Sequence, residues 1–186
     1  KMRKKPMLAY PVSDKPINYN EKISMQPKLD GVRCVIQYNN SEVKAYSRTG
    51  KEWKNIDHIL FNLKPWFALN PNIILDGELY NHSLKDDFEK IISLVRKTKP
   101  TDEDRLESAQ YVEFHCYDII DETKTFEERN NFIIQAVPRN HTVKHVKTQA
   151  VGSETLAKVI HQQNLDNGYE GSILRTNDVY KCGRSW

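Results

Sequence analysis

A lysine followed closely by Asp-Gly and then by an arginine is the feature of this chain that most directly suggests chemistry. Lys28 stands two residues before Asp30-Gly31 and five residues before Arg33. A lysine amine has an ordinary pKa of about 10.4, so it attacks as a nucleophile only where burial or nearby cations favour its neutral form. Arg33 is placed to supply such a cation and to bind a phosphate. Gly31 allows a ligand or a backbone segment to approach closely.

The same Asp30-Gly31 pair has a second interpretation. It lies between two strand-like runs, and Asp-Gly is a common two-residue hairpin turn. The two interpretations are compatible, and the lysine motif by itself is only moderately specific.

Hydrophobic patterning predicts the elements that must position these residues. Gln26 and Lys28 are two residues apart in a predicted strand, so both are expected on one face. Helices are expected after capping residues Ser83 and Ser153. Strands alternating with helices and joined by hairpin-like turns predict an α+β fold with antiparallel sheets. The other expected segments are strands at 23–29, 32–38, 43–47, 73–80, 111–120, 143–146 and 171–175, helices at 56–67 and 126–136, and an exposed loop or short helix at 97–108.

Composition is compatible with one globular core in an intracellular protein. The 186 residues are 38% hydrophobic, and the net charge of +3 permits a nucleic-acid partner without requiring one. Cys34, Cys116 and Cys182 are widely spaced, which predicts reduced thiols and a cytoplasmic location. No apolar run approaches 18 residues, so no membrane association is expected. The basic residues 1–5 are expected to form a solvated, flexible end.

Further motifs follow the lysine in a fixed order. They are Ser-Arg-Thr-Gly at 47–50, Asp-Gly-Glu-Leu at 76–79 after an apolar run, an aromatic strand at 114–120, and Tyr-Glu-Gly-Ser-Ile-Leu-Arg at 169–175. The series resembles the nucleotidyltransferase motifs of ATP-dependent DNA ligases, and most of all those of the small, phage-type members. The resemblance covers roughly residues 6–186, and the ordered combination is far more specific than any one motif.

The resemblance implies a nucleotidyltransferase (ATP-grasp-like) fold, in which two twisted antiparallel sheets with flanking helices surround a nucleotide cleft. Residues 6–186 would form the adenylation domain. Family members continue after Gly-Arg-Ser, here residues 183–185, with a segment carrying two lysines and then an oligonucleotide-binding (OB) domain. We expect both to be absent here, and we expect adenylation and full ligation by this chain to be impaired.

The resemblance also implies a reaction that uses ATP and Mg²⁺. Lys28 would attack the α-phosphorus of ATP, forming lysyl-AMP and releasing pyrophosphate. The AMP would pass to the 5′-phosphate of nicked double-stranded DNA, and the 3′-hydroxyl would then displace it. Glu170 would bind the metal at the α-phosphate, although an ordinary loop acid is the alternative. The resemblance further implies a monomer that acts in DNA replication, repair or recombination.

Nucleotide-binding roles are implied for residues on three predicted strands. Glu78 would bond the ribose hydroxyls, with an exposed strand-end acid as the alternative. Tyr117 would lie against the adenine, with packing in the core as the alternative, and its stacking would contribute about 1–3 kcal/mol. Phe114 faces the other side of that strand and is expected in the core. Gln26 would read the adenine amino group, because an amide both donates and accepts hydrogen bonds.

Four cations complete the implied site. Arg33 and Arg48 would contact the ribose, a phosphate or the DNA 5′-phosphate, with a solvated side chain as the alternative for Arg48. Arg175 and Lys181 would line the path of the DNA.

Two other classes of function stay open at this point. RNA ligases and mRNA-capping guanylyltransferases use the same lysine chemistry, and labelling with ATP or GTP, or sealing of DNA or RNA nicks, would separate them. A catalytically silent nucleotide- or nick-binding module is the third possibility. The presence of Lys28 disfavours it, because binding alone needs no nucleophile.

Overall fold

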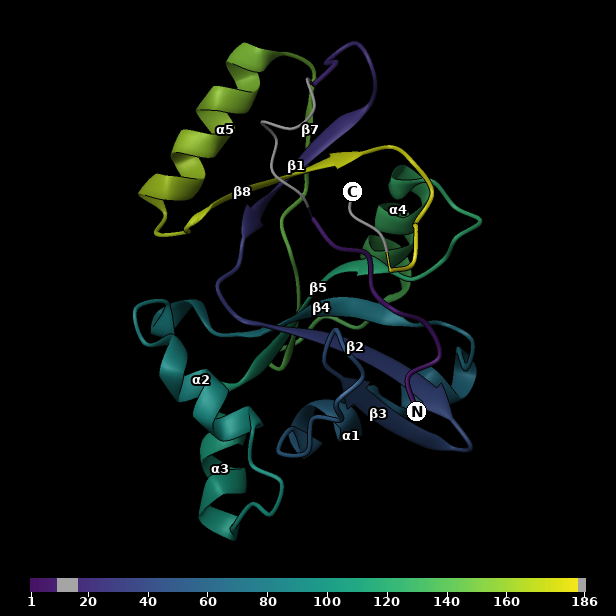
Figure 1. Ribbon diagram of the computed structural model, residues 1–186, viewed down its shortest axis with the longest axis vertical. Coiled ribbons are helices and arrows are strands. Elements are labelled where there is room, and N and C mark those ends of the chain that lie inside the picture. Colours follow the sequence, from purple (N-terminus) through teal and green to yellow (C-terminus); the bar gives the residue numbers. More distant parts are fainter. Residues whose placement is uncertain (10–16, 184–186) are drawn as a thin grey trace.

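Two β-sheets form the framework of the computed structural model, which describes residues 1–9 and 17–183 (Figure 1). The smaller sheet has three antiparallel strands in the order β7-β1-β8. The larger has five strands in the order β3-β2-β4-β5-β6. The strands are β1 (Ile23–Lys28), β2 (Val32–Asn39), β3 (Glu42–Tyr46), β4 (Leu75–Tyr80), β5 (Glu113–Ile119), β6 (Val143–His145), β7 (Gln149–Val151) and β8 (Gly171–Thr176).

Helices cover the outer sides of these sheets. Helix α5 packs on the three-stranded sheet, whereas α1, α2 and α4 contribute to the main core with the five-stranded sheet (Figure 1). The helices are α1 (Asp57–Leu69), the short 3-10 helix η2 (His82–Leu84), α2 (Phe88–Val95), α3 (Asp102–Tyr111), α4 (Phe126–Ala136) and α5 (Glu154–Asp166). The α+β fold of two sheets with flanking helices is confirmed.

The alternation of side chains along β1 separates its two faces. Ile23 and Met25 are buried against α5. Gln26 lies on the opposite face and donates a hydrogen bond to the Tyr117 carbonyl oxygen in the other sheet, at 3.1 Å. Lys28, two residues further along, shares the face of Gln26. This is the face that the sequence predicted for both residues.

Two expectations about strand pairing were wrong. Asp30-Gly31 does not close a hairpin, because β1 and β2 belong to different sheets and the chain crosses between the sheets at this point. The larger sheet is also not wholly antiparallel, since β6 pairs with β5 in the parallel sense.

One helix start differs from the prediction, and in the segment expected to be a loop or short helix the helix is what forms. Ser83 does not cap a long helix; it lies within η2, and α2 begins later, where the Asp87 side chain accepts a hydrogen bond from the Lys90 backbone. Segment 97–108 contains the start of a regular helix, α3, because Thr101 and Asp104 form a reciprocal capping box. Among the described residues no helix has both the length and the apolar character needed to cross a membrane.

The basic N-terminal segment lies along the five-stranded sheet. The Arg3 amide donates to the Gln37 side-chain oxygen at 2.8 Å, and the Gln37 amide donates to the Lys1 carbonyl at 2.7 Å. Lys4 forms an ion pair with Glu122 at 3.2 Å. The sequence predicted a solvated segment here, but these bonds give it specific partners.

Two buried aspartates face each other across β4 and β5. Asp76 and Asp118 are register partners, and neither side chain is exposed to solvent. Asp76 accepts two hydrogen bonds from Arg33, at 2.7 and 2.8 Å, and one from the Tyr180 hydroxyl at 2.6 Å. A buried carboxylate is tolerated only when it is paired and hydrogen-bonded in this way.

Asp118 is satisfied by two further arginines. Arg129, on α4, donates to both of its oxygens at 2.7 and 3.2 Å, and Arg175, on β8, donates at 2.7 Å. All three side chains are almost fully buried. The charges that join α4 and β8 to β5 therefore lie inside the protein.

We predict that Arg129→Met destabilises the protein by about 3 kcal/mol or more, because it leaves part of a buried negative charge uncompensated. The matched control is Arg105→Met, whose partner Asp102 is fully exposed; that change should cost less than about 1 kcal/mol. Urea unfolding of the two variants measures the difference. Equal effects would show that Asp118 does not depend on Arg129.

Candidate active site

The predicted nucleophile and the predicted metal ligand lie side by side. Lys28 is the last residue of β1, and Glu170 immediately precedes β8. The two strands pair with Lys28 opposite Gly171, which places the Lys28 Nζ 3.4 Å from a Glu170 carboxylate oxygen. Both side chains are about half exposed. An amine and a carboxylate thus meet at a solvent-accessible edge of the smaller sheet.

The second predicted pair comes from the larger sheet. The Tyr117 hydroxyl donates a hydrogen bond to Glu78 at 3.0 Å. A β-bulge makes this contact possible: the register passes from Asp76 opposite Asp118 to Gly77 opposite Cys116, so Tyr117 is the extra residue of β5. A bulge re-aims the side chain of the inserted residue. Phe114, three residues earlier, is fully buried in the main core, as expected.

Burial has a strong effect on Glu78. It raises the pKa of this carboxyl from its ordinary value to about 7, although the Tyr117 hydrogen bond and the nearby Arg33 charge both lower it. Burial also raises the pKa of the Tyr117 hydroxyl, so the phenol keeps its proton and remains the donor. The pair is a neutral donor beside an acid that titrates near neutral pH.

Gln26 joins the two sheets behind this pair. Its amide nitrogen donates to the Tyr117 carbonyl at 3.1 Å and to the Thr148 hydroxyl at 3.0 Å, and its oxygen accepts from Arg175 at 2.9 Å. The side chain is buried. Its polar atoms already have partners, so reading an adenine edge would require some of these bonds to be exchanged.

Arg33 is held by Asp76 and does not point freely toward a ligand. Besides its two bonds to Asp76, it donates to the Met7 carbonyl at 2.6 Å, and its guanidinium carbon lies 5.5 Å from the centre of the Tyr117 ring. Burial lowers the pKa of Arg33, but Asp76, Tyr117 and Tyr180 together raise it above its ordinary value, so it stays charged. It supplies a fixed positive charge near Tyr117 and Glu78.

Close backbone packing explains the glycine of the lysine motif. A Cβ atom at Gly31 would clash with the Leu79 carbonyl oxygen and with the side chain of Glu78. The crossing between the sheets therefore passes directly over β4. The expectation that Gly31 permits a close approach of backbone is confirmed.

Of the three remaining predicted cations, two are exposed and one is buried next to Gln26. Arg48 is exposed in a turn whose backbone amides at Thr49 and Lys51 bond the Ser47 hydroxyl. Lys181 is exposed near the end of the described chain. Arg175 is almost fully buried and bonded to Gln26 and Asp118. That burial favours a structural role for Arg175 over the DNA contact that the sequence suggested.

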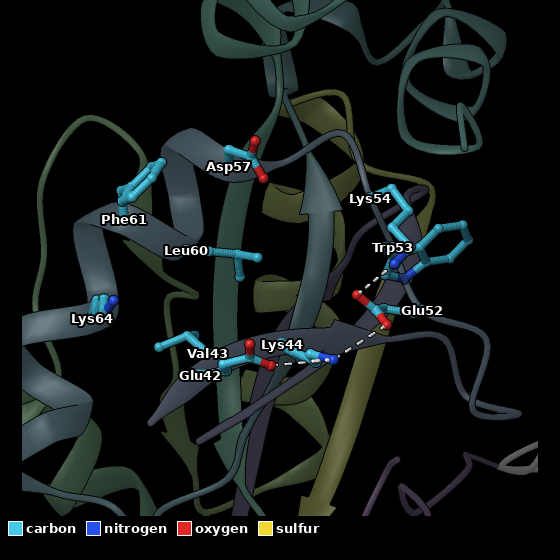
Figure 2. Close-up of a pocket in the computed structure, with 10 residues that line it drawn as sticks. All are labelled: Glu42, Val43, Lys44, Glu52, Trp53, Lys54, Asp57, Leu60, Phe61 and Lys64. Atoms are coloured by element: carbon cyan, nitrogen blue, oxygen red, sulfur yellow. Dashed lines mark hydrogen bonds and ion pairs between the residues drawn. The ribbon is translucent and has the colours of Figure 1, made fainter. Parts of the chain in front are cut away.

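A separate pocket of about 420 Å³ lies between β3, the segment after it and the start of α1 (Figure 2). Its charges alternate and pair with one another: Lys44 with Glu42 at 3.4 Å and with Glu52 at 4.0 Å, and Lys54 with Glu52 at 3.1 Å. None of the predicted site residues lines it. We therefore place the candidate active site at Lys28, not here.

The metal expectation rests on one carboxylate. Among residues 1–9 and 17–183, no group of three or more His, Cys, Asp or Glu side chains could enclose an ion. Mg²⁺ commonly uses only one or two protein carboxylates together with substrate phosphates. The half-exposed Glu170 fits that kind of site.

Sequence reasoning missed the partners that hold these residues. Asp76 and Asp118 were part of recognised motifs, but no role was assigned to either. The available signal was an acid directly after an apolar strand run, at Asp76, since a buried acid requires a cation. The sequence offers no comparable signal for Arg129 or Tyr180 as the partners.

Comparison with known proteins agrees with this geometry. The protein-family model described as ATP dependent DNA ligase domain matches residues 6–186 of this chain. The chain belongs to this family. No curated protein sequence matches it.

Solved ligase structures share the fold of this ligase domain. The Chlorella virus DNA ligase-adenylate is 21% identical, with a TM-score of 0.70 over 98% of this chain and 63% of that one. The ATP-dependent ligase of bacteriophage T7, in complex with ATP, is 16% identical, with a TM-score of 0.69 over 98% and 66%. The ligase domain spans 44% of the length of another matched structure, which is 20% identical with a TM-score of 0.75.

We predict that Glu78 of the ligase domain titrates at about pH 7 and destabilises the fold as it ionises. Its folded pKa lies above its unfolded pKa, so its contribution to stability is complete below pH 4.5 and is lost as the pH rises through about 7. Carbon-13 NMR of the carboxyl group measures the midpoint, and Tyr117→Phe should move that midpoint upward.

The stability measurement has its own control. Unfolding of Glu78→Gln should lack the part of the pH dependence that falls between these two values, whereas Glu103→Gln, at an exposed position on α3, should keep it. A Glu78 midpoint near 4.5 would contradict the burial effect.

Proposed function

We propose that this ligase domain transfers AMP from ATP to its own Lys28, as the first step of sealing a nick in double-stranded DNA. The observation that carries the proposal is the meeting of Lys28 with Glu170 at 3.4 Å, in a chain that matches the ATP-dependent DNA ligase domain over residues 6–186. A binding-only protein would need neither a half-exposed amine at this point nor a carboxylate beside it.

In the proposed reaction the deprotonated Lys28 nitrogen attacks the α-phosphorus of ATP. A nitrogen–phosphorus bond forms, the bond to the bridging oxygen breaks, and pyrophosphate leaves. After the attack, the nitrogen bonded to phosphorus loses one proton to solvent. Such a step needs the amine and the phosphorus held in line, with positive charge close to the developing negative charge. Mg²⁺, when bound at Glu170 and the phosphates, supplies much of that charge.

The larger sheet contributes the nucleoside side of the proposed site. Glu78 accepts hydrogen bonds from the ribose, and the Tyr117 ring lies against the adenine. In the structure Glu78 accepts its bond from the Tyr117 hydroxyl, so the ribose would compete with or join that donor. The Arg33 charge, fixed by Asp76, favours the ionised form of Glu78.

The later steps follow from the same assignment. The AMP held on Lys28 passes to the 5′-phosphate of the nick, and the 3′-hydroxyl displaces it as the strand closes. Among the cations that the sequence predicted to contact the nucleotide or the DNA, Arg48 and Lys181 are exposed and so are available for DNA phosphates.

We predict that incubation with ATP and Mg²⁺ adds the mass of one AMP to the chain, and that Lys28→Arg abolishes this addition. Arginine keeps the positive charge but cannot act as the nucleophile at neutral pH, because its guanidinium does not lose its proton. Intact-mass spectrometry measures the adduct. Lys22→Ala, six residues away in the same region and paired with Glu127, is the control and should be adenylated normally.

Three results would overturn the proposal. The first is the absence of any adduct on the unaltered chain, and the second is an adduct that persists in Lys28→Arg. The third is an adduct formed from GTP and not from ATP, which would indicate a capping-type guanylyltransferase.

We predict that Glu170→Gln slows adduct formation by about tenfold or more while the ATP concentration for half-maximal rate changes by less than about threefold. Glutamine keeps the shape of the side chain but loses the charge that a metal ion requires. Glu154→Gln, at an exposed position paired with Lys158 on α5, is the matched control. Equal losses in rate and in ATP affinity would assign Glu170 to substrate binding.

A further inference from the structure

One histidine connects the turn before Glu170 to the larger sheet. His82, in η2, approaches the carbonyl oxygen of Asn167 with its Nε2 atom at 2.7 Å. Its ring also stacks on Tyr169, with ring centres 4.1 Å apart and an angle of 22° between the planes. Asn167 and Tyr169 lie three residues and one residue before Glu170, so both contacts act on the approach to that residue.

A second hydrogen bond fixes the histidine itself. The Tyr80 hydroxyl lies 2.6 Å from the Nδ1 atom of His82. A carbonyl oxygen can only accept, so the proton on Nε2 points to Asn167, and in the neutral ring Nδ1 accepts from Tyr80. Burial, with the nearby Tyr169 and Asp30, raises the pKa of the Tyr80 hydroxyl, which therefore stays a donor.

The chain of contacts runs between the two sheets. Tyr80 is the last residue of β4, two residues after Glu78. Asn167 follows α5 and belongs to the side of the molecule that contains the smaller sheet. His82 therefore links the strand that bears Glu78 to the turn that bears Glu170.

The neighbouring glycine keeps this turn close to η2. Gly168 has a positive φ of 88°, and a Cβ atom there would clash with the Lys85 side chain. Within the turn, the Gly168 and Tyr169 amides donate to the carbonyls of Leu165 and Asn164, each at 3.0 Å. Strand pairing begins only at Gly171, so Glu170 lies just outside the register that fixes β8.

We propose that His82 is a positioning residue that holds Glu170 beside Lys28 by fastening the 167–169 turn to the end of β4. Its described hydrogen bonds and ring stack are with Tyr80, Asn167 and Tyr169, and it takes no part in the chemistry. The inference rests on the proposed adenylation of Lys28. Without His82, the hydrogen bonds that remain on the 167–169 turn among the described residues come from its own side, and Glu170 would sample positions away from the amine.

The effect should appear in rate and in local motion. We expect His82→Phe, which keeps an aromatic ring but loses both hydrogen bonds, to slow single-turnover adduct formation by about tenfold. The ATP concentration for half-maximal rate should change by less than about threefold. Amide hydrogen exchange of the ATP-free protein should be faster at Gly168 and Tyr169 and unchanged in β4.

Three further variants separate the contacts. His82→Gln keeps a donor able to reach the Asn167 carbonyl and should recover part of the rate. Tyr169→Leu removes the ring stack and keeps both hydrogen bonds of His82. His141→Phe, at an exposed position before β6, is the matched control and should behave as the unaltered protein.

The outcomes separate this inference from the proposed function. No adduct on the unaltered chain would overturn the proposed function and this inference with it. Normal adduct formation by both the unaltered chain and His82→Phe, or unchanged exchange at Gly168 and Tyr169, would overturn the inference alone. So would a rate loss matched by an equal loss of ATP affinity. If His82→Phe fails to fold, the same measurements on Tyr169→Leu decide the question.

Discussion

Two negative charges buried on neighbouring strands determine how this ligase domain is put together. Asp76 and Asp118 face each other across β4 and β5, where like charges without cations would repel and would be costly to desolvate. Each is therefore surrounded by donors from several different elements of the fold. Arg33, on β2, lies 43 residues before Asp76 in the sequence, whereas Arg129, on α4, lies 11 residues after Asp118.

The same charges connect the framework to the site. Through Arg175, Asp118 reaches the buried Gln26, which lies two residues before the proposed nucleophile. Through Arg33, Asp76 fixes a positive charge near Tyr117. The residues that recognise a nucleotide in our proposal are thus supported by a polar interior, whereas the main core and the cluster beneath α5 lie on the outer faces of the two sheets, against the helices.

The sequence predicted which side chains meet at the candidate site better than it predicted the residues that hold them in place. Lys28, Glu78, Tyr117 and Glu170 were recognisable because motifs are local in sequence, and the α+β fold followed from periodicity. Whether Asp30-Gly31 closes a hairpin or crosses between sheets depends on contacts with β4, which no local pattern encodes. Which cation pairs with a buried acid likewise depends on tertiary contacts. Gln26 illustrates the limit, because its face was predictable but its bonding partners were not.

The bulge at Tyr117 gives β5 one residue more than its packing requires. On one side of it Phe114 and Cys116 point into the main core, and on the other side Ile119 does the same, which an uninterrupted strand could not achieve. Removing Tyr117 would restore a regular alternation in which Phe114, Cys116 and Ile119 still face the core and Asp118 still faces its arginines. The extra residue is therefore not needed for packing, and what it adds is the hydroxyl that bonds Glu78. A single-codon deletion at Tyr117 would take away that donor while leaving both halves of β5 in their present orientation.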